Sequence, residues 1–231
     1  MKNKILKVVT IVIIIVLIIL IILGINLTKK HLIIKDISKR LANYRKANNY
    51  YVEATPTDIE NEIYYYYKLN NKEVEKRETN IIDDSIKYES YKLLGSSQRN
   101  MYIYQKDKNI AILNDKIEEV SFSNTFFNDI FKTTNKWNYI KFLLNVKITS
   151  QKYNGKECYC INVDNCLNTL TENVGGFLIE PNEVAYNFYI EKDTGLIIYN
   201  PFQQKKYEYK FDYVKENDVK EPNISEFEIE E

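Results

Sequence analysis

The stretch VKITSQKYNGKECYCINV, from Val146 to Val163, decides the fold class because it predicts a two-stranded antiparallel hairpin. Asn154-Gly155 at its centre is the favoured residue pair for a two-residue type I′ turn. That turn sets the register, so Ile148 is expected to face Ile161 across the hairpin. Side chains alternate along a strand, which places Ile161 on one face and Cys160 on the other.

Further short strands extend this pattern toward the N-terminus. Strand-like runs separated by turn residues cover 50–54, 62–69, 72–79, 85–93, 100–105 and 109–114. Connections this short favour antiparallel pairing. The run at 72–79 is polar throughout, so we expect a solvated strand at the edge of the sheet.

Toward the C-terminus, the residues around Asp193-Thr194-Gly195 predict a second hairpin, between strands at 183–191 and 196–199. Lys206 to Val214 then alternates strictly between aromatic and charged residues. Burying four unpaired charges would be prohibitive, so the aromatic set is expected to face the interior. That set is Tyr207, Tyr209, Phe211 and Tyr213.

Two segments carry helical spacing instead. Residues 29–47 place Ile33, Ile37, Leu41 and Tyr44 on one stripe, opposite a basic face. In residues 123–145, apolar side chains recur at intervals of three and four residues, which predicts one or two helices. The chain is therefore expected to be α+β, with a mostly antiparallel sheet packed on helices.

The N-terminal segment predicts a membrane anchor. Residues 8–25 are aliphatic except for Thr10 and Gly24, and a helix of that length is about 27 Å long, close to the hydrocarbon thickness. A cleaved signal peptide is the alternative, although no small-residue cleavage motif follows. We assign residues 1–7 to a cytoplasmic tail, 8–27 to a single transmembrane anchor in the cell membrane, and 28–231 to an extracytoplasmic domain. This N-in, C-out orientation is an expectation from the short N-terminal tail.

Charge is divided unevenly along a chain whose formal net charge is zero. Residues 1–47 contain ten Lys and Arg but a single acid, Asp36, so the remainder carries a net charge of −9. An acidic domain outside the cell disfavours nucleic-acid binding. The basic segment beside the membrane suits either docking on anionic lipid or an ordinary solvated helix face.

The residue inventory disfavours enzymatic chemistry. A single histidine, His31, rules out a His-rich metal site, and we expect neither a metal nor another cofactor. Asp193-Thr194-Gly195 matches the aspartic-protease triplet, but one copy without a dimer cannot share a proton, so a turn is the expected role. No set of acid, base and nucleophile converges, so we expect no catalytic residues.

The three cysteines leave two alternatives open. Cys158 and Cys160 point the same way on one strand and pair poorly with each other. A disulfide from Cys166 to either strand cysteine is allowed if the chain doubles back after Asn165, and an external location permits it; the candidate pair is Cys160 and Cys166. Otherwise the three side chains are free.

The chain holds 20 Tyr, 10 Phe and one Trp, and this surplus has two interpretations. The rings either fill a solid core or line an apolar cavity between the sheet and the helices. The candidate cavity-lining residues are Phe126, Phe127, Phe131, Trp137, Tyr207, Tyr209, Phe211 and Tyr213.

The order of these elements resembles the bacterial lipoprotein-carrier family, whose members are LolA-like or LppX-like. The segments 157–163, 189–196 and 213–227 look most like that family. The resemblance implies a curved sheet that forms an incomplete barrel around helices and shelters an apolar cavity. Through this resemblance the chain is also similar to the clostridial germination lipoproteins, which bind a cell-wall amidase. This chain departs from many surface members because it keeps an apolar helix in place of a lipidated cysteine.

These observations support two hypotheses. The leading one is a membrane-anchored, non-catalytic binding module of the cell envelope, acting in sporulation or germination. Its partner would be an envelope protein or an acylated or apolar ligand. The alternative is a structural or assembly subunit with a solid core and no ligand cavity.

Overall fold

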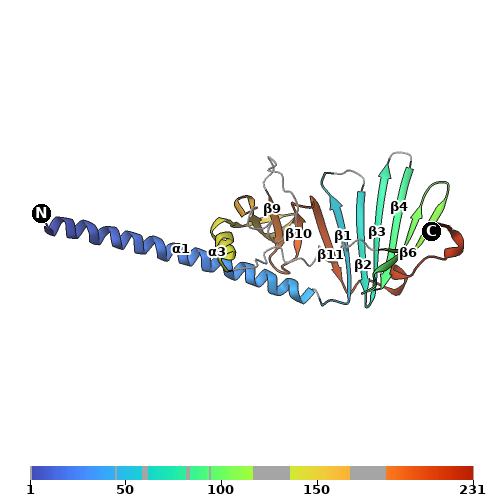
Figure 1. The fold of residues 1–231 in the computed structure, drawn as a ribbon, viewed down its shortest axis with the longest axis horizontal. Helices are drawn as coiled ribbons and strands as arrows, with labels where there is room; N and C mark the ends of the chain where they lie inside the picture. The colour runs from blue at the N-terminus through green and yellow to red at the C-terminus, as the bar shows by residue number, and fades with distance from the viewer. Residues whose placement is uncertain are drawn as a thin grey trace.

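A single large open sheet follows a long N-terminal helix (Figure 1). The computed structural model describes residues 2–44, 46–58, 62–81, 84–93, 95–116, 136–166 and 186–230. The helices are α1 (Lys2–Tyr44) and α3 (Lys136–Asn145), with 3-10 turns η1 (Asp164–Cys166), η2 (Glu216–Val219) and η3 (Ile224–Glu226). The strands are β1 (Asn49–Pro56), β2 (Glu62–Leu69), β3 (Lys72–Ile81), β4 (Asp84–Leu93), β5 (Gln98–Tyr104), β6 (Asn109–Lys116), β7 (Lys147–Tyr153), β8 (Lys156–Asn162), β9 (Asn187–Glu191), β10 (Ile197–Asn200), β11 (Lys205–Phe211) and β12 (Glu228–Glu230).

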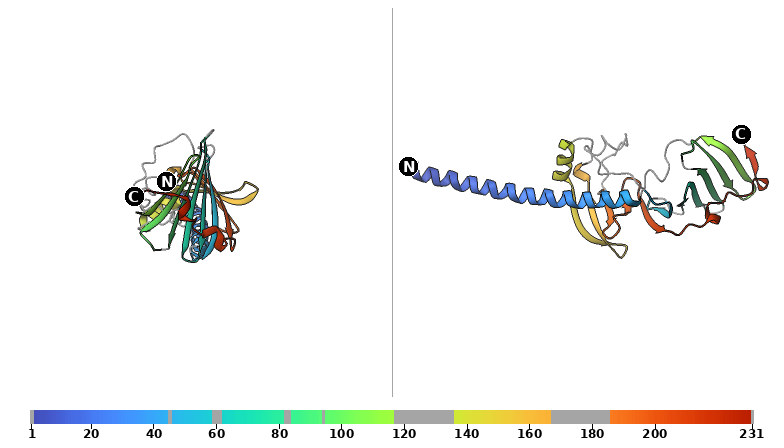
Figure 2. Two further views of the ribbon diagram at one scale, coloured as in Figure 1. Left: turned by 90° about the vertical axis from the view of Figure 1, so that its right-hand side faces the viewer. Right: turned by 90° about the horizontal axis from the view of Figure 1, so that it is seen from below.

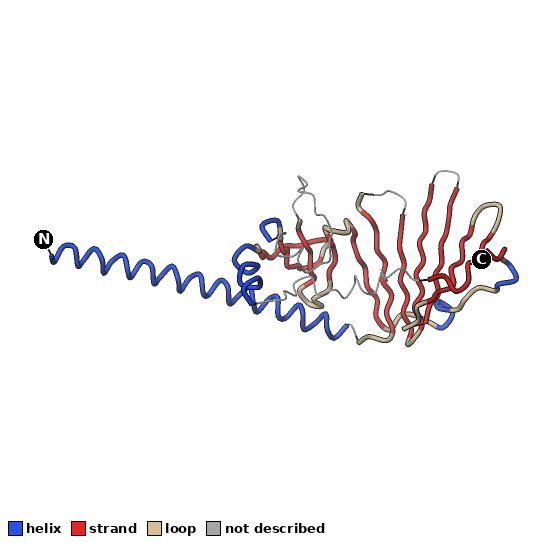
Figure 3. The backbone as a smooth tube through the Cα atoms, viewed as in Figure 1, coloured by secondary structure: helices blue, strands red, loops and turns tan. Residues whose placement is uncertain are grey.

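The sheet consists of two meanders joined along β1 and β11 (Figure 3). The described strands lie in the order β12-β6-β5-β4-β3-β2-β1-β11-β10-β9-β8-β7. Neighbours are antiparallel except for β12, which pairs parallel with β6. The expectation of a mostly antiparallel sheet is confirmed, and the sheet is not closed, because β12 and β7 are its two ends.

The hairpin of β7 and β8 has the predicted turn and register. Asn154 and Gly155 have φ angles of 48° and 78°, the left-handed values that a type I′ turn requires. Ile148 pairs with Ile161, and Thr149 pairs with Cys160. Local turn chemistry therefore determines this part of the sheet.

The expectation of a solvated edge strand at 72–79 is wrong, because β3 lies between β2 and β4. Its polar residues are accommodated by ion pairs with neighbouring strands. The Glu73 carboxylate is almost fully buried and lies 2.8 Å from Lys92 Nζ on β4. Lys76 Nζ on β3 lies 3.0 Å from the carboxylate of Glu89, which is also on β4. Cross-strand charge pairing thus allows a polar sequence to occupy an interior position.

The strict alternation predicted for Lys206 to Val214 holds only as far as Phe211. Tyr207 is 6% exposed, and Tyr209 and Phe211 are partly buried against the same cluster. Asp212 then takes a φ of 52°, where the strand ends. Tyr213 follows this break and is 52% exposed, with its ring centroid 5.7 Å from that of Tyr51, so its predicted inward position is wrong.

The helix predicted at 29–47 and the apolar run at 8–25 form one continuous helix, α1. No glycine or proline separates them after Gly24, and the Thr28 hydroxyl donates to the Gly24 carbonyl at 2.8 Å. The helix is long and apolar enough to cross a membrane, and none of its most apolar 18-residue window is buried. The large apolar side chains from Val8 to Ile25 are accordingly exposed in the structure.

The two faces of the sheet carry different hydrophobic clusters, as the neighbours Tyr50 and Tyr51 illustrate. We call the side of Tyr50 the helix face, because its cluster includes Ile34, Ile37 and Leu41 of α1 and Phe142 of α3. We call the side of Tyr51 the tail face. Its cluster includes Val214, Val219 and Phe227 of the C-terminal segment. Figure 2 shows this segment following the sheet on the side away from α1.

Candidate binding surfaces

Of the predicted cavity-lining residues, the five that the structure describes do not gather around one space. Tyr207, Tyr209 and Phe211 pack into the cluster on the helix face. Trp137 is 75% exposed on α3 and Tyr213 is exposed near the tail face, and neither is among the described lining residues of the two hollows below. Phe126, Phe127 and Phe131 lie outside the described residues.

The three inward aromatics of β11 help to fill the helix-face cluster. The Tyr209 hydroxyl donates to the Ile197 carbonyl at 2.6 Å, and the Tyr207 hydroxyl bonds the Gln203 side chain. Burial raises the pKa of both phenols. The Phe211 ring packs at a tilt against Tyr44 of α1, with ring centroids 4.6 Å apart. This part of the molecule is a packed core.

A groove of about 310 Å³ lies farther along the helix face, across β2 to β5. Its lining includes Tyr64, Arg77 and Tyr88, which are direct cross-strand neighbours. The next row adds Ser90 and Met101. Rings and a thioether on three strands therefore present apolar surface around a central guanidinium group.

Charged groups hold the walls of this groove in place. The Arg77 guanidinium lies 5.6 Å from the ring centroid of Tyr64 and 5.8 Å from that of Tyr88, and it is ion-paired with the buried Glu62. Lys205 Nζ lies 3.6 Å from the Tyr64 ring centroid. Burial lowers the pKa of this ammonium group and raises that of the Tyr64 phenol. The groove is therefore aromatic, and its lining carries the cations Lys76, Arg77 and Arg99 together with the acid Glu75.

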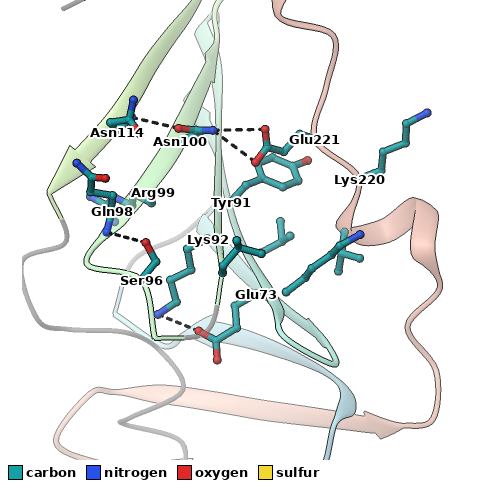
Figure 4. Close-up of a pocket in the computed structure, with 14 residues that line it drawn as sticks. Glu73, Tyr91, Lys92, Ser96, Gln98, Arg99, Asn100, Asn114, Lys220 and Glu221 are labelled. Carbon is teal, nitrogen blue, oxygen red and sulfur yellow. Dashed lines mark hydrogen bonds and ion pairs between the residues drawn. The ribbon is translucent and has the colours of Figure 1, made fainter.

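A second hollow, of about 400 Å³, lies under residues 219–221 on the tail side, where β3 and β5 begin and β4 ends (Figure 4). Its walls are polar. The Asn100 amide donates to the Glu221 carboxylate at 3.4 Å and accepts from the Asn114 backbone at 3.1 Å. Tyr102 also donates to Glu221, and its pKa is raised to about 12 by burial and by this carboxylate. The described lining contains no histidine or cysteine, and its charged side chains are Lys72, Glu73, Lys92, Arg99, Lys220 and Glu221.

A cluster of charged and hydroxyl groups on the tail face surrounds Glu89. Its carboxylate lies 2.9 Å from Lys87 Nζ and accepts hydrogen bonds from the hydroxyls of Tyr91 at 2.7 Å and Tyr104 at 3.1 Å. Burial alone would raise its pKa, but the hydrogen bonds from Lys87 and Tyr91, together with Lys76, outweigh burial and lower the pKa to about 2. A carboxylate that stays charged and saturated with donors ties strands together and is a poor proton acceptor.

The disulfide proposed between Cys160 and Cys166 is not formed, and all three cysteines are free and buried. Cys166 packs in the helix-face cluster, which also contains Ile161 of β8. Cys160 directly precedes Ile161 on that strand, so its side chain points to the opposite face of the sheet, away from Cys166. Burial raises the pKa of each thiol, to about 11 for Cys166. The thiols therefore remain protonated and unreactive near neutral pH.

His31 has a structural position. Its Nδ1 atom lies 2.8 Å from the Tyr139 hydroxyl, which joins α1 to α3. Within the described ranges no group of three or more His, Cys, Asp and Glu side chains is arranged to hold a metal ion. Asp193-Thr194-Gly195 forms the turn between β9 and β10, where Arg40 Nη1 donates to the Asp193 carbonyl at 2.5 Å.

The sequence contained no clear signal for the groove. Tyr64 to Tyr67 are four consecutive tyrosines, so the sequence could not tell whether Tyr64 and Tyr66 or Tyr65 and Tyr67 lie on the helix face. Arg77 and Tyr88 become neighbours of Tyr64 only because β3 is interior to the sheet. No protein family, curated protein or solved structure matches the chain.

Proposed function

We propose that this chain is a membrane-anchored, non-catalytic binding module of the bacterial cell envelope, with residues 28–231 outside the cytoplasm. The single observation that carries the proposal is the continuity of α1. Its exposed apolar half suits a bilayer, and Ile34, Ile37 and Leu41 of the same helix are buried among sheet residues. One rigid element then joins the anchor to the domain.

The groove on the helix face is the proposed ligand site. Its volume of about 310 Å³ lies near the lower end of small-molecule pockets, roughly 300–1,000 Å³. Tyrosine rings and Met101 suit an apolar chain, since methionine adapts to irregular shapes. Arg77 at the centre suits a ligand that also carries an anionic group. We therefore propose an acylated or apolar ligand, or an envelope protein that presents such a group.

The succession of elements also supports a lipoprotein-carrier-like fold. A helix leads into a six-stranded meander, and a hairpin and three closing strands return to pair with β1. An incomplete barrel packed on helices, and a role in sporulation or germination, are part of the proposal.

A specific observation favours the second candidate, a structural or assembly subunit. The part of the helix face nearest α1 is filled, with Phe188 and Tyr50 fully buried and Tyr207 nearly so. If the groove is only a surface depression that binds no ligand, the remaining role of the domain would be to contact other proteins of an envelope complex.

Photolabelling distinguishes these candidates. The full chain in lipid nanodiscs, labelled with a diazirine fatty acid, is expected to give adducts on β2 to β5 as well as on α1. Ser90→Phe should fill the groove and reduce the sheet adducts about fivefold or more relative to those on α1. Mass spectrometry of the peptides measures this ratio.

Ser97→Phe is the matched control, because it makes the same exchange at an exposed position in the β4–β5 turn. It should leave the ratio unchanged. A wild-type chain labelled on α1 alone would contradict the ligand site and favour the structural subunit.

A further inference from the structure

Helix α3 lies where the apolar part of α1 ends. Lys30 Nζ donates to the Leu143 carbonyl at 2.9 Å, and His31 bonds Tyr139, so α3 contacts α1 at these two residues. Ile25, the last residue of the apolar run, precedes Lys30 by five residues, which is about 7.5 Å along the helix. The headgroup layer on each side of the hydrocarbon core is about 5–8 Å thick. If α1 spans the membrane, α3 lies at the level of the headgroups.

The orientation of α3 suits that level. Figures 1 and 2 show α3 beside α1 with its axis across that of α1, at the end of the domain nearest the apolar half of the helix. A transmembrane α1 would therefore hold α3 roughly parallel to the bilayer surface. This is the orientation of amphipathic helices that bind at the membrane interface.

The exposed side of α3 carries the residues expected at such an interface. Trp137, Lys141 and Leu144 follow one another at spacings of four and three, so they share a stripe. Trp137 is 75% exposed and Leu144 is 47% exposed, while Phe142 and Leu143 on the other side are buried. Tryptophan is enriched at membrane–water interfaces, where one part of the ring is apolar and another is polar.

Lysines are the most frequent charged residues around this stripe in the part of the chain that the structure describes. Residues 26–35 and 136–147 together contain six lysines and no aspartate or glutamate, and five of those lysines are exposed. The nearby Asp36 is paired with Arg40 at 2.8 Å. Asp164 accepts hydrogen bonds from the Asn162 amide and the Tyr186 backbone. Lysines close to a membrane surface are attracted to anionic lipids.

We propose that the exposed stripe of α3 and the surrounding lysines bind the anionic headgroups of the membrane that α1 spans. This proposal rests on the proposed anchoring by α1 and adds a second contact. A helix fixed at one point can swing about it, whereas a helix with a lateral contact holds the sheet domain at a set orientation above the lipid.

The chain contains one tryptophan, Trp137, so its fluorescence reports on α3 directly. In nanodiscs with anionic lipid we expect blue-shifted emission and quenching by brominated acyl chains. Quenching should be about twofold or more stronger than in zwitterionic nanodiscs. Replacing Lys136 and Lys141 together by glutamine should remove most of that difference.

The matched control replaces Lys106 and Lys108 by glutamine. These residues lie in the β5–β6 turn at the opposite end of the sheet, so the change in charge is the same and the difference between lipids should persist (Figure 1). If the chain stays in the nanodisc while the Trp137 emission is that of a ring in water, the proposed α3 contact is wrong but the anchoring by α1 stands. Equal quenching in both lipids overturns the choice of anionic lipid. Chain that never enters the nanodisc overturns the anchoring as well.

Discussion

Replacement of Phe188 by alanine is expected to lower the free energy of unfolding by about 3–5 kcal/mol. Phe188 on β9 is fully buried in the helix-face cluster and packs edge-to-face on Phe202, with ring centroids 5.2 Å apart. Its cross-strand partner, Ile161, is also fully buried. Truncation would leave a cavity that rigid strands on both sides cannot close. Guanidinium unfolding of the full chain in detergent, followed by circular dichroism, measures the loss.

Phe211→Ala is the matched control for this change. Phe211 carries the same side chain on β11 and packs against the same cluster, but it is only partly buried. Its loss should therefore cost roughly half as much or less, because less apolar surface returns to water. Equal, small effects at both positions would show that the helix face near α1 is loosely packed, contrary to a filled core.

Replacement of Ile37 by alanine is expected to cost about 2–5 kcal/mol. Ile37 lies on α1 beyond the apolar run and is 1% exposed in the cluster that also contains Tyr50 and Val52. The loss is large only if this part of the helix is an integral part of the domain core. The same unfolding measurement on the full chain tests it.

Leu32→Ala is the matched control on the same helix. Leu32 is 57% exposed, so its truncation should change the free energy of unfolding by less than about 0.5 kcal/mol. Similar small values for Ile37→Ala and Leu32→Ala would mean that α1 is only a tether. A large effect at Ile37 alone would support one rigid element joining anchor and sheet.

Features set by neighbouring residues could be predicted from the sequence. The β7–β8 hairpin follows from Asn154-Gly155, because few other pairs adopt the required φ angles. The turn after β9 and the apolar α1 segment follow from equally local patterns. The helical stripe of Ile37 and Leu41 also identified the side of α1 that is buried.

Features set by distant pairing could not be predicted. The interior position of β3 depends on Glu73 and Lys76 meeting partners on β4, which no local pattern reveals. The exposure of Tyr213 depends on one backbone angle at Asp212. The groove around Arg77 depends on both the strand order and the choice of face among four consecutive tyrosines. The sequence predicts that Trp137 lines a cavity, because an apolar helical position usually faces a core, whereas in the structure its side chain is 75% exposed.

The central question for this protein is whether α1 holds the sheet domain outside the cytoplasmic membrane. Ser225→Cys places a thiol at an exposed position in the C-terminal segment, and the three native thiols are buried, so the wild-type chain is a low-background control. Intact cells are treated with a membrane-impermeant maleimide, and their membranes are then washed with alkaline carbonate. We expect the Ser225→Cys chain to be labelled in intact cells and to be retained in the washed membranes. Labelling only after lysis, or release of the chain by carbonate, would contradict the account.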